Sequence, residues 1–264
     1  MLYCLLTLAL SLLRCGSYRI ALGAGRILPV GLCRRLYAGP VPCDNAADRI
    51  LQQNPATELI PAEFKGNIVV IDAGNAGKFT ESVTSMLSTR CVGFDLEYVP
   101  DYYTSVHRQG ADRCRPAVIQ ISSNDTCLIY LVYKIGHLPD AVSKLLADPE
   151  VLKVSHGAPS DMRLLYRHFG VRSRNFVDLQ SVCEELQLKP CSLKSVVHRV
   201  LGLQLSKRQQ CSNWEAAELS QQQIRYAATD AWVTLQAFLQ LQPKSIRKLG
   251  VTDKGDVHVE NNAD

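Results

Sequence analysis

Short apolar runs alternate with amphipathic stretches over most of the chain, and this alternation predicts an α/β domain. Apolar and β-branched runs predict strands at 67–73, 91–97, 116–122, 127–132, 151–155 and 175–177. Helical spacing of apolar positions predicts helices at 75–89, 139–148, 159–169, 178–188 and 193–201. Three consecutive strands between 91 and 132 indicate an antiparallel meander, and the later alternation with helices indicates a mixed sheet.

The clearest helical signal lies late in the chain. Ser220 and Gln223 match an S-x-x-Q capping box, and Pro243 follows the last turn. The apolar positions between them recur at helical spacing and are Ile224, Ala228, Ala231, Leu235 and Phe238. Residues 244–264 are polar, and we expect them to form a frayed tail.

The beginning of the chain differs from the rest in charge. Residues 1–43 hold five arginines and no acid, so the net charge of +4 falls to −1 for residues 44–264. Such a segment is typical of a mitochondrial transit sequence. The apolar run 1–13 leaves open a signal segment that tethers the protein to a membrane, or an artefact of start-codon choice. We expect a mitochondrial targeting leader at 1–43, a linker at 44–65, a folded domain at 66–243 and a polar tail at 244–264.

Cysteine content and charge exclude two classes of site. None of the ten cysteines forms a C-x-x-C pair, so a structural zinc site is not expected and reduced thiols are favoured over disulfides. The nearly neutral domain is not a basic nucleic-acid-binding surface as a whole. Contacts with phosphates must therefore come from local basic patches or from bound metal ions.

Three segments carry candidate chemistry. Asp95 and Glu97 lie two apart on a predicted strand, so they share a face. Paired carboxylates repel each other unless a cation lies between them, and hard oxygen ligands suit Mg²⁺ or Mn²⁺. Asp161 opens a helix, and Tyr226 and Asp230 lie four apart on one face of the last helix. Taken singly, the strand pair is also explained by a solvent-facing strand end, Asp161 by the first turn of a helix, and the last pair by a half-buried tyrosine beside an exposed acid.

Together these segments resemble the DEDD 3′–5′ exonucleases of the tyrosine subclass, the group of ribonuclease D and the Werner-syndrome exonuclease domain. The resemblance covers about residues 67–242. It rests on five segments in order, which are Phe94-Asp95-Leu96-Glu97, Pro116-Ala117-Val118-Ile119-Gln120, His156-Gly157-Ala158 before Asp161, Cys211-Ser212-Asn213-Trp214 and Tyr226-Ala227-Ala228-Thr229-Asp230. It implies a ribonuclease H-like fold with a five-stranded mixed sheet flanked by helices.

The resemblance also implies two divalent metal ions, Mg²⁺ or Mn²⁺. Asp95, Glu97 and Asp230 would hold the first ion, while Asp95 would bridge to a second ion supported by Asp161. Two such ions stabilise the attacking and leaving oxygens of an in-line displacement. Tyr226 would orient the attacking water, and nucleoside 5′-monophosphates would leave one at a time from the 3′ end.

Four further residues are candidates for substrate contact. Leu96 lies between the two acids, where this family contacts the terminal nucleotide. Trp214 offers a ring for base stacking, with packing in the core as its alternative role. Lys207 and Arg208 would follow the phosphate backbone, unless they only form a solvated face. The loop at 101–115 would shape substrate entry, and His156 is expected to be a hydrogen-bonding residue at a strand end.

We therefore expect a 3′–5′ exonuclease that acts on single-stranded or 3′-overhanging nucleic acid. The leader favours RNA over DNA, although the residues around Trp214 resemble the Werner branch. No phosphate-binding loop G-x-x-x-x-G-K-[ST] is present, so no nucleotide cofactor is expected. The substrate would be held by the nuclease domain itself, by a homo-oligomer or by a protein partner. The alternatives are a catalytically silent nucleic-acid-binding scaffold with the same fold, and endonucleolytic use of the same site.

Overall fold

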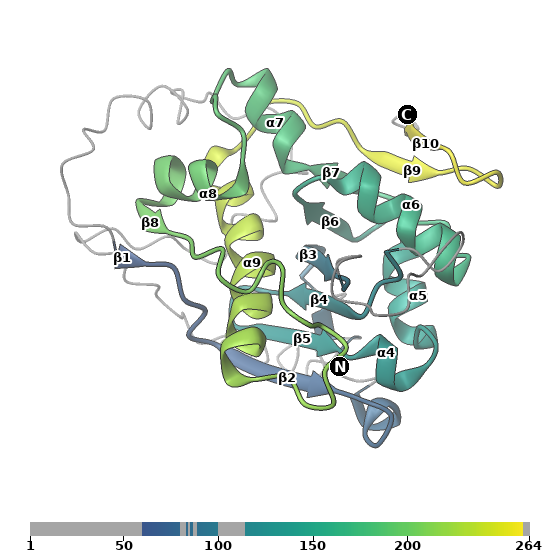
Figure 1. Ribbon diagram of the computed structural model, residues 1–264. Coiled ribbons are helices and arrows are strands. Elements are labelled where there is room, and N and C mark those ends of the chain that lie inside the picture. Colours follow the sequence, from purple (N-terminus) through teal and green to yellow (C-terminus); the bar gives the residue numbers. More distant parts are fainter. Residues whose placement is uncertain (1–59, 80–82, 84, 87–88, 100–113, 261–264) are drawn as a thin grey trace, which may run out of the picture. The chain divides into compact units, whose positions relative to one another are not determined.

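The computed structural model describes residues 60–79, 83, 85–86, 89–99 and 114–260, which all belong to the second of the chain's two units, Cys43–Asp264 (Figure 1). The predicted leader and most of the predicted linker and substrate-entry loop lie outside the described residues. In the described part of the chain, no helix has the length and apolar character needed to span a membrane.

A mixed eight-stranded sheet forms the centre of the domain. Its strands lie in the order β10 (Val257–Val259), β9 (Leu249–Val251), β7 (Phe176–Asp178), β6 (Leu152–Ser155), β3 (Cys91–Glu97), β4 (Val118–Ser122), β5 (Thr126–Tyr130) and β2 (Asn67–Ile71). Strands β3, β6 and β7 are parallel, whereas β4 is antiparallel to both β3 and β5. The α/β class, the mixed sheet and the meander are confirmed, but the sheet is larger than the five strands expected.

The predicted helices follow the strands in the predicted order, and they are α5 (Asp140–Ala147), α6 (Ala158–Phe169), α7 (Leu179–Glu185), α8 (Leu193–Val196) and α9 (Gln221–Leu241). A further short helix, α4 (Val132–Ile135), was not predicted. The predicted helix at 193–201 changes after α8 into a π-helical turn, η4 (Val197–Leu201). The predicted helix at 75–89 begins as a short 3-10 helix, η1 (Ala76–Phe79), and some of its later residues lie outside the described ones.

Strand β3 separates two apolar layers because its side chains alternate between the faces of the sheet. Val92, Phe94 and Leu96 pack in a core that includes residues of α5 and α6. On the opposite face, strands β4 and β5 pack against α9, which crosses them in Figure 1. Gly93 faces α9, so Asp95 and Glu97 must project from that same face.

Helix α9 begins at the predicted capping box and approaches β3 very closely. The Ser220 hydroxyl accepts a hydrogen bond from the Gln223 amide at 3.2 Å, and the Gln223 side chain accepts one from the Ser220 amide at 3.0 Å. A β-carbon on Gly93 would lie 2.0 Å from the Ala231 carbonyl oxygen. Only glycine therefore allows this contact, which brings the middle of α9 onto the strand that carries the paired acids.

The predicted tail at 244–264 is wrong in its central part, since β9 and β10 form a hairpin there. Strand β9 joins the sheet through Phe176 opposite Leu249, and Val251 is buried while its amide donates to the Ser173 carbonyl at 2.9 Å. Each strand spans three residues. Their apolar positions alternate too briefly to be distinguished from the polar residues around them.

The predicted linker also contains structure at its end. Strand β1 (Ile60–Pro61) pairs in parallel with β8 (Leu203–Gln204), and the Ala62 amide donates to the Gln204 carbonyl at 2.9 Å. Phe64 is buried against Trp232 of α9. The folded part of the chain thus begins before the predicted boundary at residue 66.

Lys153 is a buried lysine on β6 whose replacement we expect to stabilise the protein. Its ammonium group donates to the Asp148 carbonyl at 2.7 Å, and burial lowers its pKa from 10.5 to about 7. Between pH values of about 7 and 10.5, the unfolded chain binds more protons than the folded chain does, so the free energy of unfolding rises with pH. We expect Lys153→Met to raise stability at pH 7 by about 1–3 kcal/mol and to flatten this rise.

Thermal unfolding from pH 6 to 10 checks this expectation. The exposed Lys254 provides a control, because Lys254→Met should leave both the stability and its slope with pH nearly unchanged. A lower melting temperature for Lys153→Met at pH 7 would contradict the expected effect.

Candidate active site

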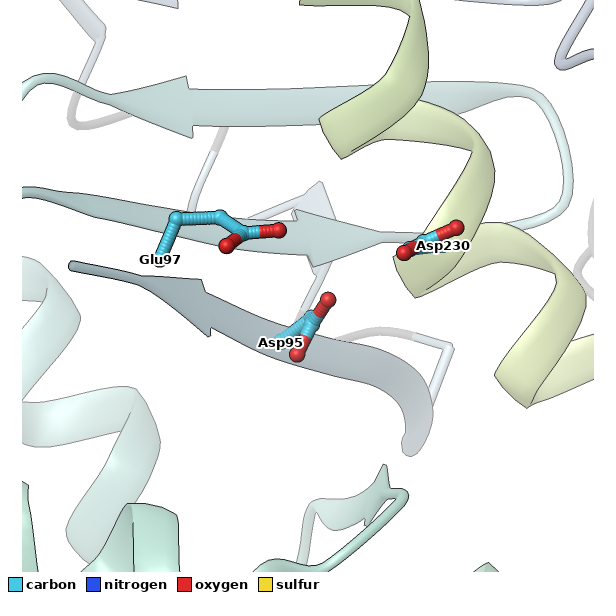
Figure 2. A group of neighbouring side chains, drawn as sticks. All are labelled: Asp95, Glu97 and Asp230. Atoms are coloured by element: carbon cyan, nitrogen blue, oxygen red, sulfur yellow. The ribbon is translucent and has the colours of Figure 1, made fainter. Parts of the chain in front are cut away.

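Three carboxylates meet where α9 crosses β3. Asp95 and Glu97 lie at the end of β3, and Asp230 projects from α9 toward them (Figure 2). One oxygen from each carboxylate lies within 4.8 Å of the others. The close contact at Gly93 explains this geometry, because Ala231 directly follows Asp230.

The environment of the three acids disfavours their negative charge. Burial raises the pKa of Asp95 to about 7, although the Leu96 amide opposes the change. Burial, followed by the charge of Asp95, also raises the pKa of Glu97 and of Asp230 well above their ordinary values. The Asp230 Oδ1 atom is buried and has no hydrogen-bond partner in the described part of the chain. Three crowded oxygen donors with an unsatisfied carboxylate fit a divalent cation.

Asp161 lies in the first turn of α6. It is outside the cluster of three carboxylates, but it interacts with them through its charge. The Ser155 hydroxyl, at the end of β6, donates a hydrogen bond to Asp161 Oδ2. Burial raises the pKa of Asp161, and the negative charge of Asp95 raises it further. The charge of Asp95 therefore raises the pKa of both Glu97 and Asp161.

The turn that presents Asp161 depends on Asp178, which the sequence analysis missed. One Asp178 oxygen accepts hydrogen bonds from the amides of Gly157 at 2.8 Å and Gln180 at 3.1 Å, and the other accepts from the Ser181 hydroxyl at 2.9 Å. Gly157 has a φ of +90°, which favours glycine. Asp178 caps α7 directly after a strand, so its capping role was readable from the sequence, but its contact with Gly157 was not.

His156 occupies the strand end before this turn. Its Nε2 atom lies 2.7 Å from the Cys191 carbonyl oxygen. The predicted hydrogen-bonding role is confirmed. All cysteines within the described residues are free, in agreement with the expected reduced thiols.

Tyr226 lies one turn before Asp230 on α9, and its hydroxyl is close enough to lower the pKa of the Asp230 carboxyl. Burial raises the pKa of Tyr226 far above its ordinary value, and the charges of Asp230 and Glu97 add to the increase. The phenol therefore stays protonated and keeps a hydrogen to donate. The structure places this side chain where the sequence predicted it.

Two predicted substrate contacts are wrong for the side chains concerned. Trp214 is completely buried and packs beside Tyr226, with ring centroids 6.0 Å apart, so it offers no face to a base. Its alternative role in the core is the one observed. The Leu96 side chain packs in the core on the face of β3 opposite to Asp95 and Glu97. Sequence position alone did not show which way either residue points.

The basic candidates lie in the exposed segment before Trp214. Lys207 is exposed, and its positive charge reaches Asp230, where it lowers the pKa of the carboxyl. Arg208 is also exposed, and its amide donates to the Ser206 hydroxyl at 3.3 Å. Cys211, an exposed thiol that the sequence analysis did not consider for the site, is close enough to affect the pKa of Glu97.

Removing the donor to Asp161 should weaken the site without unfolding the domain. We expect Ser155→Ala to raise the Kd for Mn²⁺ by about 10-fold or more, since partners of ligands commonly have effects of this size. Calorimetric titration with MnCl₂ measures this Kd. Ser173→Ala is a matched control, because Ser173 is equally buried but lies before β7 and its hydroxyl has no partner in the described part of the chain. Equal Kd values for the two variants would contradict the role of Ser155.

Comparison with known proteins agrees with this geometry. The model of a family described as 3′–5′ exonuclease matches residues 75–246. The chain is 33% identical over 202 residues to the mouse bifunctional 3′–5′ exonuclease/ATP-dependent helicase WRN. This match covers 73% of the present chain and 14% of the mouse protein. The chain is 29% identical to the Drosophila melanogaster exonuclease 3′–5′ domain-containing protein 2, over 68% of this chain and 31% of that protein. The chain thus spans less than a third of the length of each of these two relatives.

Solved structures show the same fold. The catalytic core of RRP6 from Trypanosoma brucei superposes with a TM-score of 0.59 at 21% identity, over 83% of this chain and 57% of that one. Ribonuclease D from Trypanosoma brucei, in a complex with RNA, gives a TM-score of 0.56 at 24% identity, over 67% and 63% of the two chains. The ribonuclease H-like fold expected from the resemblance is confirmed. On the family match and the fold together, the chain belongs to the 3′–5′ exonuclease family.

Proposed function

We propose that this chain is a metal-dependent exonuclease that hydrolyses nucleotides one at a time from the 3′ end of a nucleic-acid strand. The observation that carries the proposal is the group formed by Asp95, Glu97 and Asp230, whose ligand oxygens lie within 4.8 Å of one another beside Asp161. A scaffold without activity has no need to keep so many buried acids together, because their repulsion destabilises the fold. The complete set therefore favours an enzyme over the silent scaffold.

Each residue has a distinct role in the proposed reaction. Asp95, Glu97 and Asp230 would hold one Mg²⁺ or Mn²⁺, and Asp161 with Asp95 would hold a second. The bound ions would supply positive charge that acidifies the attacking water and offsets charge on the phosphate. Tyr226 would donate a hydrogen bond that orients this water for attack on phosphorus.

The attacking oxygen forms a new bond to phosphorus as the bond to the 3′ oxygen breaks. The terminal nucleotide then leaves as a 5′-monophosphate, and the shortened strand keeps a free 3′ hydroxyl. Lys207 would pair with a phosphate of the strand, since its charge already reaches Asp230. Arg208 would extend the same basic surface.

We favour RNA as the substrate class. The support is the fold shared with a ribonuclease D that was solved in a complex with RNA, together with the arginine-rich, acid-free residues 1–43, which favour mitochondrial RNA trimming. Imaging of the full chain with a carboxy-terminal fluorescent tag tests this location. Loss of mitochondrial signal on deletion of 1–43 is expected, whereas a membrane signal elsewhere would favour the tethered alternative.

Matched oligonucleotides test the activity itself. The purified chain is incubated with RNA and DNA of one sequence, each labelled at the 5′ end, in Mg²⁺, Mn²⁺ or EDTA. A ladder that shortens from the 3′ end, faster for RNA and absent in EDTA or with Asp95→Asn, is expected. Strand binding without cleavage in either metal would favour the scaffold, and internal cuts would indicate an endonuclease. DNA turnover equal to or faster than RNA turnover would overturn the proposed substrate class.

A further inference from the structure

Gln120, on β4, is a buried amide that the roles described above leave unexplained. Its side chain is 0% exposed, and neither its Nε2 nor its Oε1 atom has a hydrogen-bond partner within the described residues. Burying an amide in this way costs free energy, so native proteins rarely leave both ends of one unsatisfied. Such a group needs an explanation in terms of what its surroundings bind.

The sheet register places Gln120 beside Asp95, one of the three clustered carboxylates. Gln120 is the cross-strand partner of Asp95, and such partners share a face of the sheet with β-carbons about 5 Å apart. That face is the one on which α9 meets Gly93, two residues before Asp95. The long Gln120 side chain therefore lies under α9, where β3 and α9 bring their acids together.

A second unsatisfied atom belongs to the cluster of three carboxylates that includes Asp95. Asp230 Oδ1 is a buried acceptor without a partner in the described part of the chain, and the Gln120 amide supplies two donor hydrogens and one acceptor. The unpaired donor of Gln120 and the unpaired acceptor of Asp230 indicate that a bound species supplies the missing hydrogen-bond or ligand partner of each. A hydrated divalent cation does so, because it binds the carboxylates and its hydration shell both donates and accepts hydrogen bonds.

Apart from Asp95, the neighbours of Gln120 on the strands leave its amide without a hydrogen-bond partner. Ile129, across on β5, is apolar. Along β4, Val118 is apolar, and the Ser122 hydroxyl already donates to the Ser123 carbonyl at 2.9 Å. Among the described neighbours of Gln120 on these strands, Asp95 is thus the group that matches the amide in chemistry.

We propose that Gln120 is a positioning residue of the metal centre, and this inference rests on the proposed function. With the cation bound, its amide would hydrogen-bond the hydration shell, and it would thereby fix the orientation of the carboxylates that hold the cation. Gln120 touches no substrate in this role. It acts through Asp95 and Asp230, so its removal changes metal affinity before it changes strand binding.

Calorimetric titration of the full chain with MnCl₂, without nucleic acid, tests the proposal. We expect Gln120→Met, which keeps the length of the side chain but removes the amide, to raise the Kd for Mn²⁺ by about 10- to 100-fold. In EDTA its melting temperature should equal or exceed that of the wild type, because an unsatisfied buried amide is gone. Ser122→Ala is the matched control, since it removes a buried polar group from the same face of β4 and should leave the Kd unchanged.

The outcomes separate this inference from the proposed function. Tight Mn²⁺ binding by the wild type, with equal Kd values for the wild type and Gln120→Met, overturns the role of Gln120 and leaves the exonuclease proposal intact. Absence of Mn²⁺ binding by the wild type overturns both. If Gln120→Met does not fold, Gln120→Leu replaces it in the same titration, and wild-type affinity or a failure of this variant to fold in EDTA makes Gln120 a purely structural residue.

Discussion

Asp230→Asn should lower kcat by about a thousandfold or more, equivalent to roughly 4 kcal/mol of transition-state stabilisation. The substitution keeps the shape of the side chain but removes one of three negative charges within 4.8 Å of one another. The remaining acids then hold a cation less tightly and with different geometry. Initial rates of mononucleotide release at saturating Mn²⁺ measure the effect, and the strand affinity of the variant should stay close to that of the wild type.

The same substitution should stabilise the protein when no metal is bound. Burial and Asp95 raise the pKa of Asp230, so the folded state holds its proton to a higher pH than the unfolded state does. Stability is therefore lost as pH rises above the ordinary value of 3.8, and a neutral amide avoids this loss. Melting in EDTA at pH 8 should show a higher temperature for Asp230→Asn. Asp256→Asn, at an exposed acid in the β9–β10 turn, should change neither property. Activity within tenfold of the wild type would show that Asp230 is no ligand.

Gly93→Ala should damage both the fold and the site. The new β-carbon would lie 2.0 Å from the Ala231 carbonyl oxygen and 3.0 Å from the Leu235 β-carbon, so α9 must move away from β3. Overpacking of this kind costs about 3 kcal/mol or more when backbone has to shift, and the melting temperature should fall by roughly 6–12 °C. The shift also moves Asp230 away from Asp95, so activity should fall even at temperatures where the variant is folded.

Gly77→Ala is the control for Gly93→Ala. Gly77 lies in η1, where a new β-carbon would meet no atom of the described residues within 4 Å, and its φ is not positive. Its replacement should be neutral or slightly stabilising. A Gly93→Ala variant with wild-type melting temperature and activity would show that the close approach of α9 is not required for the site.

The candidate site was predictable because its residues follow local periodicities. Asp95 and Glu97 are separated by the strand repeat, and Tyr226 and Asp230 by the helical repeat, so each pair shares a face whatever the rest of the fold does. The order of these segments along the chain was enough to indicate the family. Ser155 and Gln120 were not identified, because their roles depend on partners across the sheet or across a turn.

The errors in the fold arise where pairing is long-range and strands are short. Strand β1 pairs with β8, and β9 pairs with β7, so the decisive contacts join segments far apart in sequence. Two or three alternating residues carry too little local signal to predict such strands. Trp214 and Leu96 fail for a related reason, since an apolar residue near an active site packs inward or outward according to tertiary contacts alone.

The dependence of the site on α9 also has a consequence for biosynthesis. When β3 has emerged from the ribosome, Asp95 and Glu97 are exposed, but Asp230 has not yet been added to the chain. The cluster of three carboxylates is therefore complete only when α9 has left the exit tunnel and packed against Gly93. Until that moment the nascent chain lacks Asp230, so the site has too few carboxylates to hold a cation as the folded domain would.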